Sequence, residues 1–110
     1  MKELVEYFSK KRVLFKSLHE VDKTLLKTRK KLSIFSSTDT KKNYHSIFII
    51  TQKSRFLVKN AIELEKIEYE LQRLEKHNFK YKHLIIGEAV CSKASSYLKE
   101  RGWQLRHDFM

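Results

Sequence analysis

Residues 46–50 (SIFII) form an apolar run that leads into the basic, hydroxyl-bearing segment 51–55 (TQKSR). A second run, residues 83–87 (HLIIG), leads after a few residues into 91–93 (CSK). Nearly unbroken apolar runs are typical of strands that are covered on both faces. A helical pattern follows each run, and strand, loop and helix in that order form the unit of a parallel sheet. The two runs therefore predict an α/β domain with a ligand site at the carboxyl ends of its strands.

Three strands and two helices are predicted to alternate in the second part of the chain. The strands cover residues 44–51, 81–88 and 103–109, and the helices cover residues 55–77 and 92–101. The helices are predicted from apolar residues spaced three and four positions apart. The last strand alternates apolar and polar residues, which favours the edge of the sheet. Right-handed crossovers between the strands would make them parallel.

The first third of the chain shows a different pattern. From residue 2 to residue 32 apolar side chains recur at spacings of three and four, which predicts one long amphipathic helix. The next segment is rich in Ser and Thr and predicts a surface loop. We expect a single domain with a helix in 1–33, a loop in 34–43 and a βαβαβ core in 44–110. Its small sheet has three mainly parallel strands, with helices on both faces and elements in the order α-β-α-β-α-β.

The charge of the chain is unbalanced. Lys and Arg number 24 against 13 Asp and Glu, which gives a formal net charge of +11. Residues 1–33 hold ten of the basic residues and four of the acidic ones. Such an excess favours a polyanionic partner such as DNA or RNA. The alternative is that the charge is a general property of a lysine-rich proteome.

Two groups of residues are candidates for binding phosphate. The first lies on the basic N-terminal segment and comprises Lys10, Lys11, Arg12, Lys30 and Lys31. The second lies in the two loops after the predicted strands and comprises Gln52, Lys53, Ser54, Arg55, Ser92 and Lys93. The N-terminus of a helix attracts anions, and both loops lead into helices. The alternative is that the lysines are solvated and that the serines, Ser54 first among them, are helix N-caps.

Cys91 is the single cysteine, so no intramolecular disulfide forms and a reducing cytoplasm is the expected location. It precedes a predicted helix and lies near Lys93, and both features favour the thiolate. The stretch 91–94 (CSKA), followed by Leu98 and Gly102, resembles the glutaredoxin and arsenate-reductase pattern. That resemblance implies a reactive thiol at Cys91. The chain departs from the pattern because it has neither a second cysteine nor a proline, and a buried inert cysteine is the alternative.

The sequence offers no set of catalytic residues, no metal ligands and no cofactor motif. None of the five histidines pairs with another histidine or with cysteine at a spacing typical of a metal site. His45 and His83 stand near the starts of their strands, so we expect them at the edge opposite the predicted ligand site. No apolar run is long enough to span a bilayer.

Three hypotheses for the function follow. The first is a small basic module that binds nucleic acid, or associates with a ribonucleoprotein, through charge. The second is a small enzyme or phosphate-ligand-binding domain that uses the loops after the strands. The third is a module that forms a homodimer or binds a protein partner through its first helix. An enzymatic role is less favoured than binding.

Overall fold

The computed structural model describes residues 2–21, 32–50, 56–87 and 90–106 of the chain. The strands are β1 (Phe15–Val21), β2 (Leu32–Asp39), β3 (Tyr44–Ile50), β4 (Tyr81–Ile86) and β5 (Trp103–Arg106). The helices are α1 (Lys2–Lys10), α2 (Val58–Glu75) and α3 (Ser92–Glu100). The five strands lie in one sheet in the order β1-β2-β3-β4-β5. Strands β1, β2 and β3 pair antiparallel, whereas β3, β4 and β5 pair parallel.

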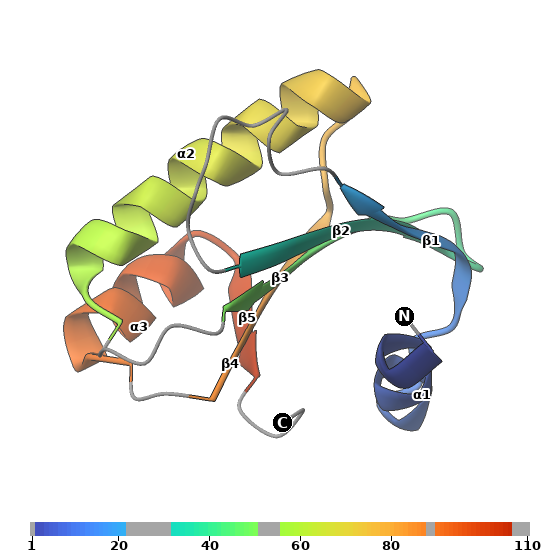
Figure 1. Cartoon of the computed structure of the whole chain (residues 1–110), viewed down its shortest axis with the longest axis horizontal. Helices are drawn as coiled ribbons and strands as arrows, with labels where there is room; N and C mark the ends of the chain where they lie inside the picture. Colours follow the sequence, from blue (N-terminus) through green and yellow to red (C-terminus); the bar gives the residue numbers. More distant parts are fainter. Residues whose placement is uncertain (1, 22–31, 51–55, 88–89, 107–110) are drawn as a thin grey trace.

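The sheet is covered by helices on both faces (Figure 1). Helices α2 and α3 pack on one face, where Phe48, Leu84 and Trp103 form part of the larger core. Helix α1 packs on the other face through Leu4 and Phe8, which lie one turn apart and are 2% and 0% exposed. No helix in the described residues is both long and apolar enough to cross a bilayer.

The expected three-stranded, mainly parallel sheet with a long N-terminal helix is wrong. Helix α1 ends at Lys10, and the chain continues as β1 at the edge of the sheet. The register of β1 with β2 shifts between Phe15 and Ser17, which breaks the alternation of side chains along the strand. Phe15 and Leu18 therefore both pack in the smaller core beside α1, whereas Val21 packs in the larger core on the opposite face. Along the sequence these three apolar residues recur every third position, which imitates one stripe of a helix.

The predicted loop in 34–43 is also wrong, because most of it belongs to β2. Ser36, Ser37 and Asp39 are buried in the sheet at 3%, 2% and 8% exposure. Their polar groups suggested a surface segment, but the backbone of β2 is paired on both sides, with β1 and with β3. Small side chains therefore occupy the interior there, and only a short turn joins β2 to β3.

After residue 43 the elements lie close to their predicted positions. Helix α2 begins at Val58 and buries a stripe that includes Ala61, Leu64 and Leu71. Leu57 holds the N-cap position, and the side chain of Asn60 accepts a hydrogen bond from the Leu57 N–H. Ser54, predicted as the N-cap, lies outside the described residues. Strand β5 lies at the edge of the sheet, as its alternation predicts.

Four described residues adopt left-handed backbone conformations. They are Arg12 (φ 64°), Lys42 (φ 67°), Lys76 (φ 61°) and Gly102 (φ 84°). Three of the four carry long cationic side chains at a position where glycine or asparagine is the usual residue. Each such residue costs about 1 kcal/mol relative to glycine.

Replacing Gly102 by alanine is expected to lower the free energy of unfolding by about 1 kcal/mol. An added Cβ would meet no atom within 4 Å, so the cost is conformational rather than steric. Urea unfolding of Gly102→Ala measures it, with Ser96→Ala on the exposed face of α3 as the control. Equal stability of the two variants would contradict the expectation.

Candidate functional site

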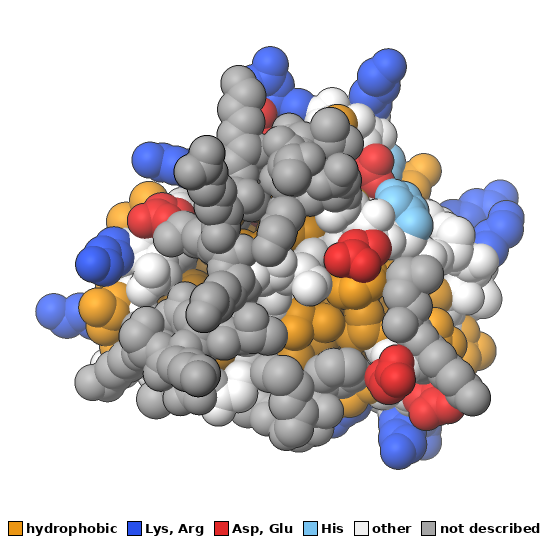
Figure 2. Space-filling model, viewed as in Figure 1, with side chains coloured by type: hydrophobic (Ala, Val, Ile, Leu, Met, Phe, Trp, Pro, Cys, Tyr) orange, Lys and Arg blue, Asp and Glu red, His pale blue; other side chains and the backbone are white. Residues whose placement is uncertain are grey.

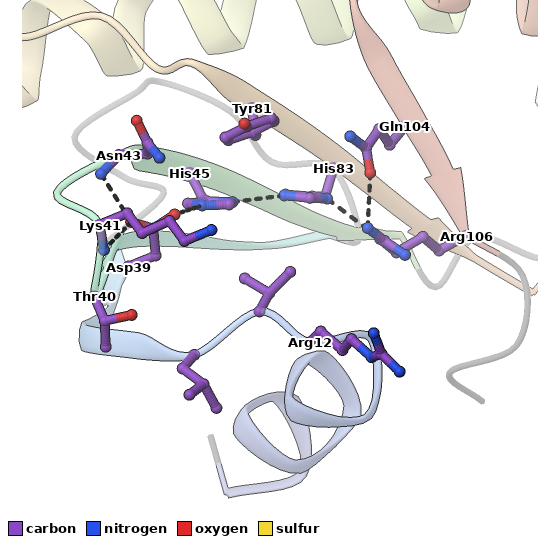
Figure 3. Close-up of a pocket in the computed structure, with 12 residues that line it drawn as sticks. Arg12, Asp39, Thr40, Lys41, Asn43, His45, Tyr81, His83, Gln104 and Arg106 are labelled. Atoms are coloured by element: carbon purple, nitrogen blue, oxygen red, sulfur yellow. Dashed lines mark hydrogen bonds and ion pairs between the residues drawn. The ribbon is translucent and has the colours of Figure 1, made fainter.

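A cavity of about 230 Å³ opens on the α1 side of the sheet, near the starts of β3 and β4 (Figure 3). We call it the hairpin pocket, because the turn between β2 and β3 forms one of its walls. The turn after α1 forms another wall, and side chains of β3, β4 and β5 form its floor. Its lining residues are Arg12, Val13, Leu14, Asp39, Thr40, Lys41, Asn43, His45, Tyr81, His83, Gln104 and Arg106.

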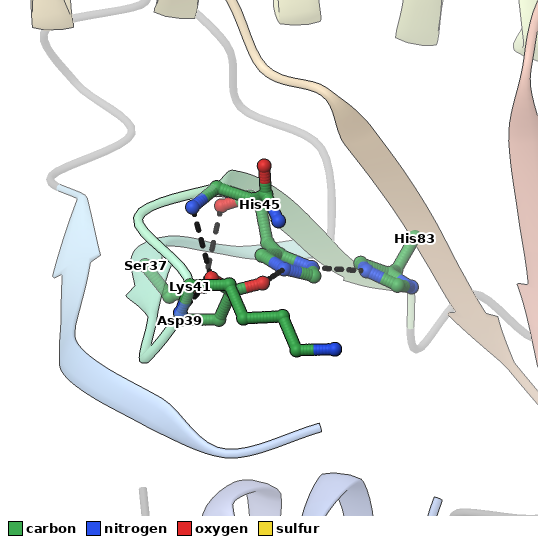
Figure 4. Close-up of polar contacts among 6 residues, drawn as sticks. Ser37, Asp39, Lys41, His45 and His83 are labelled. Carbon is green, nitrogen blue, oxygen red and sulfur yellow. Dashed lines mark hydrogen bonds and ion pairs between the residues drawn. The ribbon is translucent and has the colours of Figure 1, made fainter. Parts of the chain in front are cut away.

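Four of these side chains form a continuous row of hydrogen bonds across the sheet. Arg106 Nε donates to His83 Nδ1 over 3.2 Å. His83 Nε2 lies 2.9 Å from His45 Nδ1, and His45 Nε2 lies 2.9 Å from Asp39 Oδ2 (Figure 4). The two imidazole planes are within 7° of each other, and their ring centroids are 5.2 Å apart. The row therefore joins one residue from each of β2, β3, β4 and β5.

The two ends of the row fix the proton on every nitrogen within it. The guanidinium of Arg106 can only donate, so His83 Nδ1 accepts and His83 Nε2 carries the proton. His45 Nδ1 then accepts from His83, and His45 Nε2–H donates to the carboxylate of Asp39, which can only accept. Both histidines are thus neutral and hold the same Nε2–H tautomer. A second proton on either ring would leave two donors facing each other.

Asp39 anchors the row and the turn together. Its Oδ1 accepts hydrogen bonds from the N–H groups of Lys41 (2.9 Å) and Asn43 (2.8 Å). Burial alone would raise the pKa of Asp39, but the hydrogen bonds from His45, Asn43 and Lys41 outweigh it and lower the pKa to about 2. The carboxylate therefore stays ionised and fully bonded.

Burial keeps both histidines neutral. His45 and His83 are 3% and 1% exposed. Burial lowers the pKa of His83 to about 2, with a further contribution from the charge of Arg106. Burial also lowers the pKa of His45 and outweighs its hydrogen bond to Asp39, which acts in the opposite direction.

Aromatic rings enclose the histidines. The ring of Tyr81 stacks on His45 at 4.7 Å between centroids, and Phe15 meets the same imidazole edge-on at 5.4 Å. Phe8 of α1 meets His83 edge-on at 4.9 Å. These contacts explain how an apolar helix face can cover a polar row.

Arg106 is held on three sides. Besides its bond to His83, its Nη2 donates to Gln104 Oε1 over 2.7 Å. Its guanidinium also lies 5.0 Å from the ring centroid of Phe8, within the range of a cation–π contact. The residues that the structure describes supply no acceptor for its other N–H groups. Arg106 is also one of the residues that line the hairpin pocket.

This arrangement suits anion binding better than acid–base or metal chemistry. All four ring nitrogens of His45 and His83 are used within the row, so neither imidazole has a free nitrogen for a substrate. Nowhere in the described ranges do three or more His, Cys, Asp or Glu residues converge on a metal-binding position. The pocket instead offers the cations of Arg12, Lys41 and Arg106.

The structure brings one predicted phosphate-binding residue to this pocket. Arg12 lines it, whereas Lys10 and Lys11 are exposed at the end of α1 and do not. Ser92 and Lys93 are exposed in the first turn of α3. Their roles stay predictions. The remaining candidates lie outside the described residues: Lys30, Lys31, Gln52, Lys53, Ser54 and Arg55.

Cys91 is half-buried at the N-cap of α3, where its Sγ accepts a hydrogen bond from Ala94 N–H at 3.3 Å. Near Cys91, Phe56 and Val90 form a parallel β-bridge, so the segments that lead into α2 and α3 lie side by side. The reactive thiol and the anion site there stay predictions, since most of the first loop lies outside the described residues.

The sequence interpretation missed Asp39, His45, His83, Gln104 and Arg106. His45 and His83 lie near the starts of their strands, as expected. The ligand site, however, was predicted at the opposite end of those strands. Adjacent parallel strands place His45 beside Tyr81, and Ile47 beside His83. The one available signal was a histidine at an inward position near the start of each of two apolar strands.

No family model matches the chain, and no curated protein matches it. Among solved structures it is similar to EndoMS in its apo form, with a TM-score of 0.57 and 14% sequence identity. The match covers 96% of this chain and 44% of that chain, so this chain spans less than half the length of EndoMS. At this identity the similarity shows the fold alone, and no functional residue is transferred.

Proposed function

We propose that this protein binds nucleic acid by contacting phosphates, with the cations of the hairpin pocket among its contacts. The observation that carries the proposal is the composition of that pocket. Arg12, Lys41 and Arg106 line it, and its single carboxylate, Asp39, is already bonded to three donors. A polyanion entering the pocket therefore meets three cations and one ionised carboxylate that already accepts three hydrogen bonds.

The rest of the surface supports the same class of partner. The net charge of +11 raises the local concentration of polyanions and accelerates their association. In the view of Figure 2, the described Lys and Arg side chains lie at several places around the outline of the molecule.

Fluorescence anisotropy with labelled single- and double-stranded DNA and RNA across a salt series tests the proposal. We expect binding that weakens steeply as salt rises, because each phosphate contact releases counterions. Two double variants separate the pocket from general charge. The pocket pair combines Arg12→Gly with Lys41→Gln. The control pair combines Lys76→Gly with Lys59→Gln, two residues outside the pocket. Like the pocket pair, it removes two positive charges, one of them at a position with left-handed backbone.

The pocket pair should bind about tenfold more weakly than the control pair, and its slope of log affinity against log salt should fall by about 2. Both Gly substitutions fall at left-handed positions, so neither should unfold the protein. No binding at low salt would overturn the proposal. An equal loss of affinity in the pocket pair and the control pair would show that binding depends on the general charge and does not involve the pocket.

A further inference from the structure

The hairpin pocket has a size and a charge that fit a narrower class of ligand than nucleic acid in general. Its volume of about 230 Å³ is below the roughly 300–1,000 Å³ of typical small-molecule sites. It has room for a charged group and for part of the molecule that carries this group. A whole dinucleotide cofactor would exceed it.

The charges that line the pocket leave an excess of two positive charges, three from Arg12, Lys41 and Arg106 against one negative charge from Asp39. A phosphodiester inside a strand carries one negative charge. A phosphate monoester carries close to two at neutral pH, because its second pKa is about 6. The monoester therefore matches the excess more closely.

The geometry of the cations also favours a discrete anionic group. Arg106 is fixed by His83, by Gln104 and by the ring of Phe8, so its guanidinium is oriented before any ligand arrives. A fixed guanidinium that presents parallel N–H groups binds phosphate oxygens with defined geometry. Arg12 and Lys41 are exposed at the mouth of the pocket and can close on the same group.

We infer that the hairpin pocket binds a phosphate monoester dianion, with Arg12, Lys41 and Arg106 as its ligands. This inference rests on the proposed function in one respect: the expected source of the monoester is the phosphorylated end of a nucleic-acid strand. A free nucleoside monophosphate presents the same chemistry. The row from Asp39 to His83 positions Arg106 and does not itself touch the ligand.

Two oligonucleotides of one sequence, which differ only in a 5′-phosphate or a 5′-hydroxyl and carry a label at the 3′ end, test the inference by anisotropy. The phosphorylated strand should bind about tenfold more tightly than the hydroxyl strand, as expected for added charge-assisted hydrogen bonds. The preference should disappear in the pocket pair and persist in the control pair. Equal affinity of the two strands for the unmodified protein would overturn the inference and leave the proposed function standing.

The pH dependence supplies a second readout. Between about pH 7.5 and about pH 5 the monoester takes up a proton, so the preference for the phosphorylated strand should shrink. The groups that face it are Arg12, Lys41, Asp39, His45, His83, Tyr81 and Arg106. The hydroxyl strand corrects for any general loss of binding in the same range. A preference that does not change with pH would contradict a dianionic ligand.

If neither strand binds, the proposed function is overturned, and adenosine monophosphate then tests the inference alone. A rise in melting temperature with adenosine monophosphate but not with adenosine, lost in the pocket pair, would support a monoester site. The absence of any rise would overturn it.

Discussion

Acidification from about pH 6.5 to about pH 4 is expected to lower the free energy of unfolding by about 3 kcal/mol through His83 alone. The pKa of His83 falls to about 2 in the folded protein, whereas an unfolded histidine titrates near 6.5. Between these values the unfolded chain binds a proton that the folded chain does not. Stability is therefore complete above about pH 6.5 and is lost as the pH falls below it.

Three other groups shift the size of this effect. The pKa of His45 is also lowered, by burial, so it adds to the loss in the same direction. The pKa of Asp39 is lowered to about 2, so the stability that it contributes is lost only below about pH 4. Burial raises the pKa of Glu68, which favours the folded state as the carboxyl is protonated and opposes the histidines. The two histidines act in the same direction, whereas Glu68 alone opposes them, so we expect a net loss of stability between about pH 6.5 and about pH 4.

Urea unfolding at a series of pH values measures this dependence. The variant His83→Gln keeps one acceptor for Arg106 and one donor for His45 but does not titrate, so its stability should fall less steeply with acid. The unmodified protein over the same pH series is the reference. Stability that is the same at about pH 7 and about pH 4.5 would contradict the neutral state of the buried pair.

The substitution Asp39→Asn is expected to destabilise the fold by about 3 kcal/mol at neutral pH. Asp39 accepts three hydrogen bonds, two from the turn and one from His45. An asparagine has one acceptor oxygen and one NH₂ group, so it must present a donor either to the turn or to His45. If His45 reverses its tautomer in response, the conflict moves along the row until His83 faces the guanidinium of Arg106 with an N–H group. Two buried donors therefore face each other wherever the proton is placed.

Chemical denaturation of Asp39→Asn at neutral pH measures this cost. Glu70→Gln is the matched control, since that carboxylate is half-exposed in α2 and its removal should cost less than about 0.5 kcal/mol. Nitrogen chemical shifts of the imidazoles provide an independent readout, because both rings should report the Nε2–H tautomer in the unmodified protein. A loss as small as that of the control, or the opposite tautomer, would contradict the proton arrangement derived for the row.

The sequence by itself determined the second part of the fold. Strands β3 and β4 follow from unbroken apolar runs that are buried on both faces, and helices α2 and α3 follow from apolar residues spaced three and four positions apart. It also identified the excess of positive charge and named Arg12, which lines the hairpin pocket, as a candidate phosphate contact; that role stays a prediction. These features depend on residues that are near each other along the chain.

The tertiary structure alone decided the first third and the site. Strand β1 lies at an edge with a shifted register, and β2 buries serines between two neighbouring strands, so neither carries the apolar alternation that marks a strand. The row from Asp39 to Arg106 joins one residue from each of four strands. Which side chains meet across a sheet depends on the order and register of its strands, and no local period of the sequence encodes that order. The pocket and the charge state of its histidines therefore exist only in the folded chain.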